Sequence, residues 1–461
     1  MSSFIVFDSK SKTKRHLDLQ VKKKVKLYVC GMTVYDRCHI GHGRVMVFFD
    51  TFVRCLRAFE YAVQYVRNVT DIDDKIIQRA QCDGTDWLTV AKTYTQKMQE
   101  DECALNVLPP DETPKATEFM SEMIAMIETL ISRDYAYVAE DGDVYFSVRN
   151  FRNYGNLSHQ DLGALTASVR KALSSHKRDN LDFVLWKLAK QDEPGWSSPW
   201  GKGRPGWHIE CSAMATTLLG EQIDIHGGGV DLKFPHHENE TAQSEAATGK
   251  PFVRQWMHVG HVMSGAEKMS KSLGNFSTIH TLLESFQPEV LRYFLLSTHY
   301  RSPLQFSHER LIQSRQALSK LYNALLVADL ADDLSTDQRP AEFDDAIVDD
   351  MNIPKALSVC FELSNQIHIL KKTDPSTVQK FALQLQGCLR LLGLGFVSPK
   401  SFLQDTRGLQ ITRADIEATI QQRQLARENK NWQLADQLRE KLSRYDIVLE
   451  DSEAGTQWQR H

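Results

Sequence analysis

The chain has 461 residues, 42% of them hydrophobic, and its 55 Lys and Arg nearly balance its 59 Asp and Glu, which leaves a net charge of −4. This length predicts several domains, and the small net charge excludes a molecule-wide field that attracts polyanions, so any nucleic-acid contact must be local. No run of about 18 apolar residues is present, which excludes a membrane span, and eight cysteines without paired spacing predict free thiols in a cytoplasmic protein.

A strand, a helix and a second strand follow one another near the beginning of the chain. Residues 25–30 are β-branched and aromatic and are followed by Gly31, which predicts a buried strand and then a turn. Apolar residues at helical spacing predict a helix over residues 42–56, and a second strand is predicted over residues 62–69. This order predicts a βαβ unit of a parallel sheet.

The pattern changes at about residue 115. A helix is predicted up to Arg133, followed by a strand-like segment at residues 141–146 and then by polar, irregular sequence as far as Trp207. These features predict an insertion into the sheet domain. The sheet pattern returns at residues 223–225.

Beyond residue 280 the chain is predicted to be almost entirely amphipathic helix. The acidic segment 329–350 predicts a linker, and residues 401–461 predict a small separate unit. Two stretches rich in Lys and Arg, 10–26 and 423–444, either make a local nucleic-acid contact or form solvated surface.

A first motif, His39-Ile-Gly41-His42, lies between the first predicted strand and the helix. Helix N-termini beyond the carboxyl ends of parallel strands present free N–H groups to phosphates. The two imidazoles, three residues apart, can face one anion, and Gly41 lets a flat base approach the backbone. A motif this short also arises by chance, so alone it does not establish a nucleotide site.

A second motif, at residues 267–275, contains Lys268 and Lys271 together with hydroxyls and a glycine. Such a loop can close over a triphosphate and neutralise the charge that grows on the leaving pyrophosphate. Alone it is equally typical of an exposed basic turn. The two motifs together, about 230 residues apart with a sheet return between them, resemble class I aminoacyl-tRNA synthetases.

Further segments narrow this resemblance to the cysteinyl-tRNA synthetase family, and the resemblance spans nearly the whole chain. The segments that carry it are Cys30–Asp36, Asn68–Lys75, Pro205–Met214 and Phe234–Glu240. The resemblance implies an α/β fold: a Rossmann-like parallel-sheet catalytic domain with an insertion, followed by an α-helical bundle and a small C-terminal anticodon-binding domain. It also implies that L-cysteine is activated with ATP to cysteinyl adenylate and transferred to the 3′ end of tRNA(Cys).

The corresponding domain prediction divides the chain into six parts. They are the first half of the catalytic domain (1–114), the connective insertion (115–206), the second half of the catalytic domain (207–250), the region of the second motif, which contacts the tRNA stem (251–310), the helical tRNA-binding bundle (311–400) and the anticodon-binding domain (401–461).

Cysteine-specific recognition calls for a metal. Cysteine differs from serine by one sulfur, and shape alone separates such near-isosteres only about a hundredfold, whereas a thiolate that coordinates Zn²⁺ separates them far better. The sequence offers Cys30 at the end of the first strand, Cys211, and the pair His236 and Glu240, one turn apart on a helix predicted to begin at Pro235. Taken singly, each cysteine also fits a small buried hydrophobe and the His–Glu pair a surface pair.

In the family that this chain resembles, the counterparts of these four residues hold one zinc ion, and the substrate thiolate completes its coordination. Zinc also lowers the thiol pKa, so that cysteine binds as the thiolate. Because selection happens at binding, the family has no editing domain.

The resemblance implies roles for further residues. Catalysis, with Mg²⁺ accompanying ATP, is assigned to His39, His42, Lys268 and Lys271. ATP contacts are assigned to Gly41, His42, Gly228, Asp231 and Lys271, and substrate contacts to Thr33, Trp207 and Asp231. Anticodon contacts are assigned to Arg427, Trp432 and Asp436. Trp207 and Trp432 would each also suit ordinary core packing.

The expected partners are therefore L-cysteine, ATP and tRNA(Cys), and the expected state is a monomer in the cytoplasm. Two alternatives stay open. A cysteine ligase of the same ancestry that acylates an amino sugar would lack the C-terminal domain. A non-catalytic, zinc-containing RNA-binding module would be free to lose either motif, yet both are present.

Overall fold

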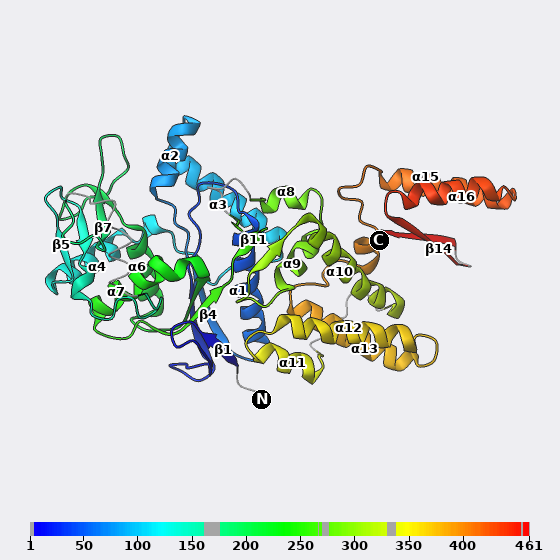
Figure 1. Ribbon diagram of the computed structural model, residues 1–461, viewed down its shortest axis with the longest axis horizontal. Coiled ribbons are helices and arrows are strands. Elements are labelled where there is room, and N and C mark those ends of the chain that lie inside the picture. The colour runs from blue at the N-terminus through cyan, green and yellow to red at the C-terminus, as the bar shows by residue number, and fades with distance from the viewer. Residues whose placement is uncertain are drawn as a thin grey trace.

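The structure, a computed structural model, describes residues 4–160, 176–265, 267–269, 276–329, 338–452 and 455–460. In Figure 1 a central sheet region lies between the insertion on one side and a helical region on the other, with the last helices and strands at the far end. Across the described ranges, no helix is both long and apolar enough to cross a bilayer.

The central sheet has four parallel strands in the order β10-β9-β3-β4. They are β3 (Lys24–Val29), β4 (Ala62–Arg67), β9 (Ile223–Gly229) and β10 (Val253–Val259). The predicted βαβ unit is confirmed, because α1 (Ile40–Ala58) connects β3 to the parallel strand β4. Helix α1 begins before the predicted start at residue 42 because the His39 side chain caps its N-terminus.

Strand β9 is longer than predicted. The sequence predicts a strand only over residues 223–225, yet β9 continues through the three glycines that follow His226. At Gly227, an ideal Cβ would lie 2.1 Å from Cζ of Phe49 in α1. Glycine therefore does not end the strand here but lets α1 pack closely against the sheet.

Helices cover both faces of this sheet. Alternate side chains of a strand point to opposite faces, so Leu27 and Val29 pack in the core that includes α1, whereas Tyr28 packs with residues of α6 (Trp207–Leu219). Helix α7 (Glu238–Thr248) packs against α6 on that second face. Two helices follow β4 along the chain: α2 (Asp74–Asp83) and α3 (Trp87–Ala104).

The insertion forms an antiparallel sheet of its own in the order β5-β6-β7-β8. Its elements are α4 (Met120–Ser132), β5 (Ala136–Val138), β6 (Val144–Phe146), β7 (Phe183–Leu188) and β8 (Gly203–Pro205). The predicted helix is confirmed as α4 and the strand-like segment 141–146 as β6, whereas β5 was not predicted and the prediction of irregular sequence up to Trp207 is wrong at β7 and β8. Leu185 and Trp186 of β7 are fully buried, so tertiary packing orders a strand whose flanks are polar.

The C-terminal part is mainly helical, as predicted. Its helices are α8 (Ile279–Leu283), α9 (Pro288–Leu296), α10 (His308–Ala328), α11 (Ala341–Val348), α12 (Ile353–Leu370), α13 (Pro375–Leu391) and α14 (Pro399–Leu403). The last unit, with a small core of its own, consists of α15 (Arg413–Glu428), α16 (Trp432–Ser443), β14 (Ile447–Ser452) and β15 (Gly455–Arg460). The short strands elsewhere are β1 (Ile5–Asp8), β2 (Thr13–His16), β11 (Val262–Ser264), β12 (Glu267–Lys268) and β13 (Leu304–Phe306).

The prediction of a linker over residues 329–350 is wrong for its second half, where α11 forms. Phe343, Ala346 and Ile347 of α11 are fully buried, while the acidic residues lie between them in sequence. The charge count of the segment therefore obscured an amphipathic helix. Residues 330–337 lie outside the described part of the chain.

Arg292 of α9 joins the sheet domain to the helical region. Its side chain is fully buried and forms an ion pair with Asp50 of α1. Its Nε donates to the Leu392 carbonyl at 2.7 Å, and its Nη1 donates to the Leu105 carbonyl at 2.9 Å. A buried guanidinium is tolerated only with such compensation, so α9 is fixed against both regions.

We expect Arg292→Met to lower the free energy of unfolding by about 2–5 kcal/mol, because it leaves the buried Leu392 and Leu105 carbonyls without their donor and removes one of the two cations that pair with Asp50, of which Arg54 remains. Urea unfolding followed by circular dichroism measures this loss. The matched control is Arg413→Met, which breaks an exposed pair with Glu417 and should cost less than about 1 kcal/mol. Equal losses for the two variants would contradict the role given to Arg292.

Candidate active site and metal centre

A cavity of about 630 Å³ opens at the carboxyl edge of the central sheet, where β3, β9 and β10 end. Its lining includes these residues predicted for the site: Cys30, Thr33, His39, Gly41, His42, Trp207, Asp231 and Lys268. Of the others, Gly228 lies within β9, where an ideal Cβ would approach the His237 ring to 3.0 Å. Lys271 lies outside the described residues.

The two histidines of the first motif are held by the N-terminus of α1. His39 Nδ1 accepts from the backbone N–H groups of Gly41 at 3.1 Å and His42 at 3.3 Å, and His42 Nδ1 accepts from the His39 N–H at 3.3 Å. Their rings stack with centroids 3.7 Å apart. Because each Nδ1 is an acceptor, each neutral ring carries its proton on Nε2, which makes Nε2 the donor toward a ligand.

The second motif approaches the cavity from β12. Lys268 Nζ lies 3.0 Å from Oδ2 of Asp231, which follows β9, and both side chains are about half exposed. This ion pair connects the end of β9 to β12, which holds the first residues of the motif. The structure thus brings Lys268 and Asp231 together, at the same cavity as the histidines of α1.

The four predicted metal ligands meet in one buried cluster. Their ligand atoms all lie within 4.8 Å of one another, and none of the four residues is more than 6% exposed. The Cys30 Sγ lies 3.8 Å from the Cys211 Sγ and 3.3 Å from Oε1 of Glu240, and His236 Nε2 lies 3.1 Å from the same Oε1. Two thiols, an imidazole and a carboxylate at these distances suit a single borderline-soft cation such as Zn²⁺.

Three elements position these ligands. Cys30 follows β3, and Cys211 lies in the second turn of α6. His236 lies in an irregular helical turn (Lys233–His237) that precedes α7, and Glu240 lies in the first turn of α7 itself. The helix was predicted to begin at Pro235, whereas regular α-helix begins at Glu238, but His236 and Glu240 do share one face.

Further histidines, which sequence reasoning missed, surround this cluster. His226 Nε2 lies 2.8 Å from Oε2 of Glu240, and His208 Nδ1 lies 2.9 Å from His236 Nδ1. His237 Nδ1 lies 2.8 Å from His258 Nε2. Two of them, His208 and His237, lie within the segments Pro205–Met214 and Phe234–Glu240 already singled out in the sequence, which was the available signal.

A second set of ligand atoms, from Cys30, His226, His237 and Glu240, also lies within bonding reach of one ion. This set contains one thiol, whereas the predicted set contains two. Because soft sulfur ligands favour zinc, the predicted set is the better zinc site. His226 then serves to orient Glu240 through the hydrogen bond to its second oxygen.

The ionisation of the cluster follows from its burial and mutual contacts. Burial and the neighbouring Cys211 raise the pKa of Cys30 well above its usual value, so this thiol stays neutral. The hydrogen bond from Cys30, which outweighs burial, lowers the pKa of Cys211 to about 6. Burial disfavours a charged His236, but Glu240 and Cys211 more than offset this and raise its pKa to about 10.

The sequence left two interpretations open for Trp207 and Trp432, a ligand contact or ordinary core packing. Trp207 is 40% exposed and lines the cavity, with its ring 4.3 Å from that of His236, so it forms a wall rather than core. Trp432, the first residue of α16, is 59% exposed. Arg427 forms an ion pair with Asp451 at 3.0 Å, and Asp436 is exposed on α16.

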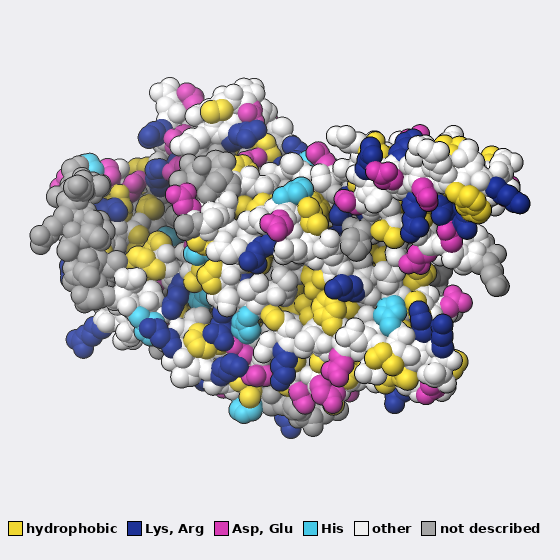
Figure 2. Space-filling model, turned by 45° about the vertical axis from the view of Figure 1, so that its right-hand side comes forward, with side chains coloured by type: hydrophobic (Ala, Val, Ile, Leu, Met, Phe, Trp, Pro, Cys, Tyr) yellow, Lys and Arg dark blue, Asp and Glu magenta, His cyan; other side chains and the backbone are white. Residues whose placement is uncertain are grey.

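These C-terminal residues lie far from the cavity, on the helices at the right of Figure 1. Figure 2 shows Lys and Arg side chains beside hydrophobic ones over this end of the molecule. The exposed apolar residues there include Leu425, Trp432 and Leu434. Cations beside exposed apolar side chains are typical of surfaces that bind single-stranded nucleic acid.

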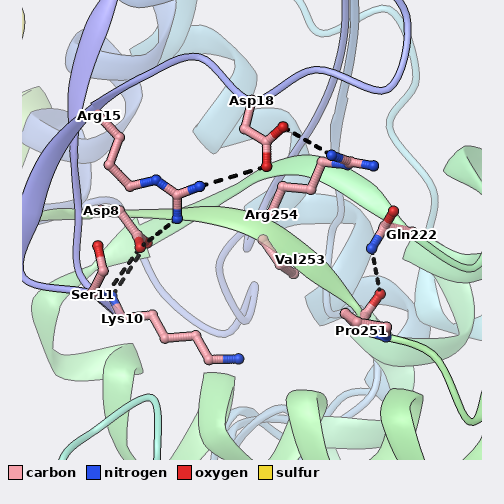
Figure 3. Close-up of a pocket in the computed structure, with 9 residues that line it drawn as sticks. All are labelled: Asp8, Lys10, Ser11, Arg15, Asp18, Gln222, Pro251, Val253 and Arg254. Carbon is pink, nitrogen blue, oxygen red and sulfur yellow. Dashed lines mark hydrogen bonds and ion pairs between the residues drawn. The ribbon is translucent and has the colours of Figure 1, made fainter.

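A second hollow, shown in Figure 3, lies at the beginning of β10 and so at the opposite edge of the sheet. Most of its charged side chains pair with one another: Asp18 lies 2.9 Å from Arg254 and 3.5 Å from Arg15, which also lies 3.5 Å from Asp8. Part of the basic stretch 10–26 lines this hollow. Since these charges are mutually compensated, this part of the stretch is ordinary solvated surface.

Comparison with known proteins agrees with this geometry. A family model described as the tRNA synthetases class I (C) catalytic domain matches residues 16–316, a DALR domain model matches residues 342–397, and a cysteinyl-tRNA ligase anticodon binding domain model matches residues 412–458. A cysteine–tRNA ligase of Methylococcus capsulatus is 50% identical over 99% of both chains. One of Pseudomonas aeruginosa is 48% identical over 98% of both.

The chain belongs to the cysteinyl-tRNA synthetase family. A methionyl-tRNA synthetase of Mycobacterium tuberculosis in complex with methionyl-adenylate shares the fold, with a TM-score of 0.56 and 16% identity over 80% of this chain and 89% of that one. The predicted class I architecture is thus confirmed. The two motifs and the four sequence segments had indicated this same family.

For this member of the cysteinyl-tRNA synthetase family we expect proton release when the cluster takes up a divalent cation, because ligands bind deprotonated. Near pH 7.5 the neutral Cys30 thiol and the His236 imidazolium must each lose a proton, while Cys211 is already ionised, which gives about two protons per ion. Near pH 5 the Cys211 thiol, whose pKa is about 6, is still protonated, so its ionisation releases about one more proton per ion.

Titration calorimetry of the metal-depleted protein with Zn²⁺, in buffers of different ionisation enthalpy, counts these protons. Cys82→Ser, which changes an exposed cysteine outside the cluster, should leave the count unaltered. A count that is the same at both pH values would contradict the ionisation states derived above.

Proposed function

We propose that the chain ligates L-cysteine to tRNA(Cys) in two steps. The cysteine carboxylate oxygen attacks the α-phosphorus of ATP, the bond to the bridging oxygen breaks, and pyrophosphate leaves. A terminal ribose hydroxyl of the tRNA then attacks the carbonyl carbon, the bond to the phosphate breaks, and AMP leaves with the hydroxyl proton. The observation that carries this proposal is that Cys30, from the buried ligand cluster, lines the same cavity as His39 and His42.

The donor set favours zinc as the resident ion. The four side chains are buried, mutually close and of the sulfur, nitrogen and oxygen types that zinc prefers. Zinc bound by Cys30, Cys211, His236 and Glu240 would supply a borderline-soft Lewis acid for the thiol of the substrate cysteine. Serine has no thiol to bind to this ion. Trp207 and Thr33, on the cavity wall near Cys30, would enclose the rest of the amino acid.

The remaining residues act on ATP. His39 and His42 donate from Nε2 to the phosphate on which charge develops, supported by the N-terminus of α1. Lys268 and Lys271 neutralise the β- and γ-phosphates, with Mg²⁺ bound to the nucleotide. Gly41, on the cavity wall, gives the nucleoside room, Gly228 would contribute only through the neighbouring Gly229 that lines the cavity, and Asp231 accepts from a ribose hydroxyl or the base amino group.

The transfer step needs tRNA contacts at two distant places. Arg427, Trp432 and Asp436 would contact the anticodon, which the match to an anticodon-binding model supports.

The protein would act as a cytoplasmic monomer. The C-terminal unit distinguishes it from an amino-sugar ligase, and the two intact motifs distinguish it from a non-catalytic RNA-binding module.

The direct test is cysteine-dependent exchange of pyrophosphate into ATP, measured with each of the twenty amino acids, followed by acylation of tRNA(Cys). We expect exchange with cysteine to exceed exchange with serine by much more than the roughly hundredfold that shape alone provides. Comparable rates with serine would reject thiol-based selection. Acylation of an amino sugar instead of tRNA would favour the first alternative.

We expect Cys211→Ala to lose the bound zinc and to weaken cysteine binding at least about a hundredfold, because the cluster loses one of its two thiolates. Metal analysis and equilibrium binding of cysteine measure the two effects. The matched control is Cys55→Ala, which removes a buried thiol from the other face of the sheet. Unaltered cysteine affinity in Cys211→Ala would refute the metal-based account.

We expect Trp432→Ala to slow tRNA acylation about 5- to 150-fold, since stacking on a base contributes about 1–3 kcal/mol. Adenylate formation, which needs no tRNA, should be affected far less. Leu434→Ala, at another exposed apolar position of α16, is the control. A parallel fall of both activities would show that Trp432 supports the fold instead.

A further inference from the structure

The active-site cavity has a third wall that neither the nucleotide contacts nor the metal ligands use. Its members are Tyr35, Arg67, Lys75 and Met98. The sheet order β10-β9-β3-β4 explains its place. The ends of β10 and β9 carry the nucleotide side, the end of β3 carries Cys30, and Arg67 ends β4 at the remaining edge.

This third wall combines an aromatic face with a cation. The Tyr35 ring is partly buried, and Nζ of the exposed Lys75, in α2, lies 5.4 Å from its centroid. Met98 of α3 is buried and gives an apolar, polarisable surface. The Arg67 charge is compensated, because its guanidinium pairs with Glu102. Lys75 is thus the cation of this wall that is directed to solvent.

A second cation–aromatic arrangement continues outward from this wall. Arg79, one turn beyond Lys75 on α2, lies over the Tyr94 ring of α3 at 5.3 Å, and Lys97 lies over the same ring at 4.6 Å. Because Tyr94 is buried and Arg79 also pairs with Asp83, Lys97 is the side chain of this arrangement that can meet a phosphate of a single strand. The acidic neighbours Asp36 and Asp73 also act on Tyr35 and offset part of the positive charge of this wall.

Acyl transfer requires a place for the end of the tRNA inside this cavity. The attacking ribose hydroxyl must reach the carbonyl carbon of the adenylate, whose nucleotide already occupies the side of β9 and β10. The wall at the end of β4 is a part of the described lining that carries none of the proposed cysteine or ATP contacts. A nucleotide there would find a ring on which to stack its base and an ammonium group for its phosphate.

We propose that the 3′-terminal adenosine of the tRNA stacks on Tyr35, with Lys75 contacting its phosphate, and that the α2–α3 pair guides the preceding nucleotides. This inference rests on the proposed function and adds the subsite for its second substrate. It makes Tyr35 a substrate-binding residue of the transfer step.

The test compares binding of tRNA(Cys) that ends in CCA with tRNA(Cys) that ends in CC, together with single-turnover transfer from preformed cysteinyl adenylate. In the unaltered protein the full-length tRNA should bind more tightly than the truncated one. Tyr35→Ala should abolish this difference and slow transfer about 5- to 150-fold, with a much smaller effect on pyrophosphate exchange. Tyr35→Phe, which keeps the ring, should restore both.

The matched control is Lys92→Ala, which removes an exposed lysine of α3 that does not line the cavity. Lys75→Gln should weaken binding of the full-length tRNA, whereas Lys92→Ala should not. If Tyr35→Ala still distinguishes CCA from CC ends, or slows exchange as much as transfer, the subsite is refuted. Absence of cysteine-dependent exchange in the unaltered protein would instead reject the proposed function itself.

Discussion

The site depends on the burial of four ionisable side chains at the end of β3. Two thiols, an imidazole and a carboxylate within 4.8 Å of one another carry a large desolvation cost unless they compensate one another or share a cation. Their burial fixes the relative position of β3, α6 and α7, because each element supplies at least one of them. The surrounding histidines then orient these ligands and hold their protons in definite places.

The order of the parallel strands would distribute the proposed substrates along one edge of the sheet. Strands β9 and β10 end beside Asp231 and Lys268, strand β3 ends at Cys30, and strand β4 ends at Arg67. The histidines at the N-terminus of α1 line the same cavity as these strand ends. A single topological feature would therefore place the amino acid, the nucleotide and the proposed end of the tRNA around one reacting centre.

Much of the fold and of the cavity was predictable from the sequence. The alternation of strand and helix patterns predicted the βαβ unit, and the resemblance singled out Cys30, Cys211, His236 and Glu240, which the fold brings together. Their spacing predicts only that His236 and Glu240 meet, because Cys30 and Cys211 lie in elements that only the sheet topology brings next to this pair. The carry-over of residues by resemblance supplied what local patterns lacked.

The misses have a common physical cause, which is that tertiary packing overrides local pattern. The strand at residues 183–188 is ordered by burial of Leu185 and Trp186 in a polar stretch, and α11 forms in an acidic segment because Phe343 is buried. His226 and His258 were missed because their partners are distant in sequence.

Zinc-edge X-ray absorption tests the central claim most directly, because it counts the sulfur atoms bound to the ion. The account predicts two sulfur ligands, from Cys30 and Cys211, in the protein alone, and a third when cysteine but not serine is added. An unaltered sulfur count with saturating cysteine would contradict it.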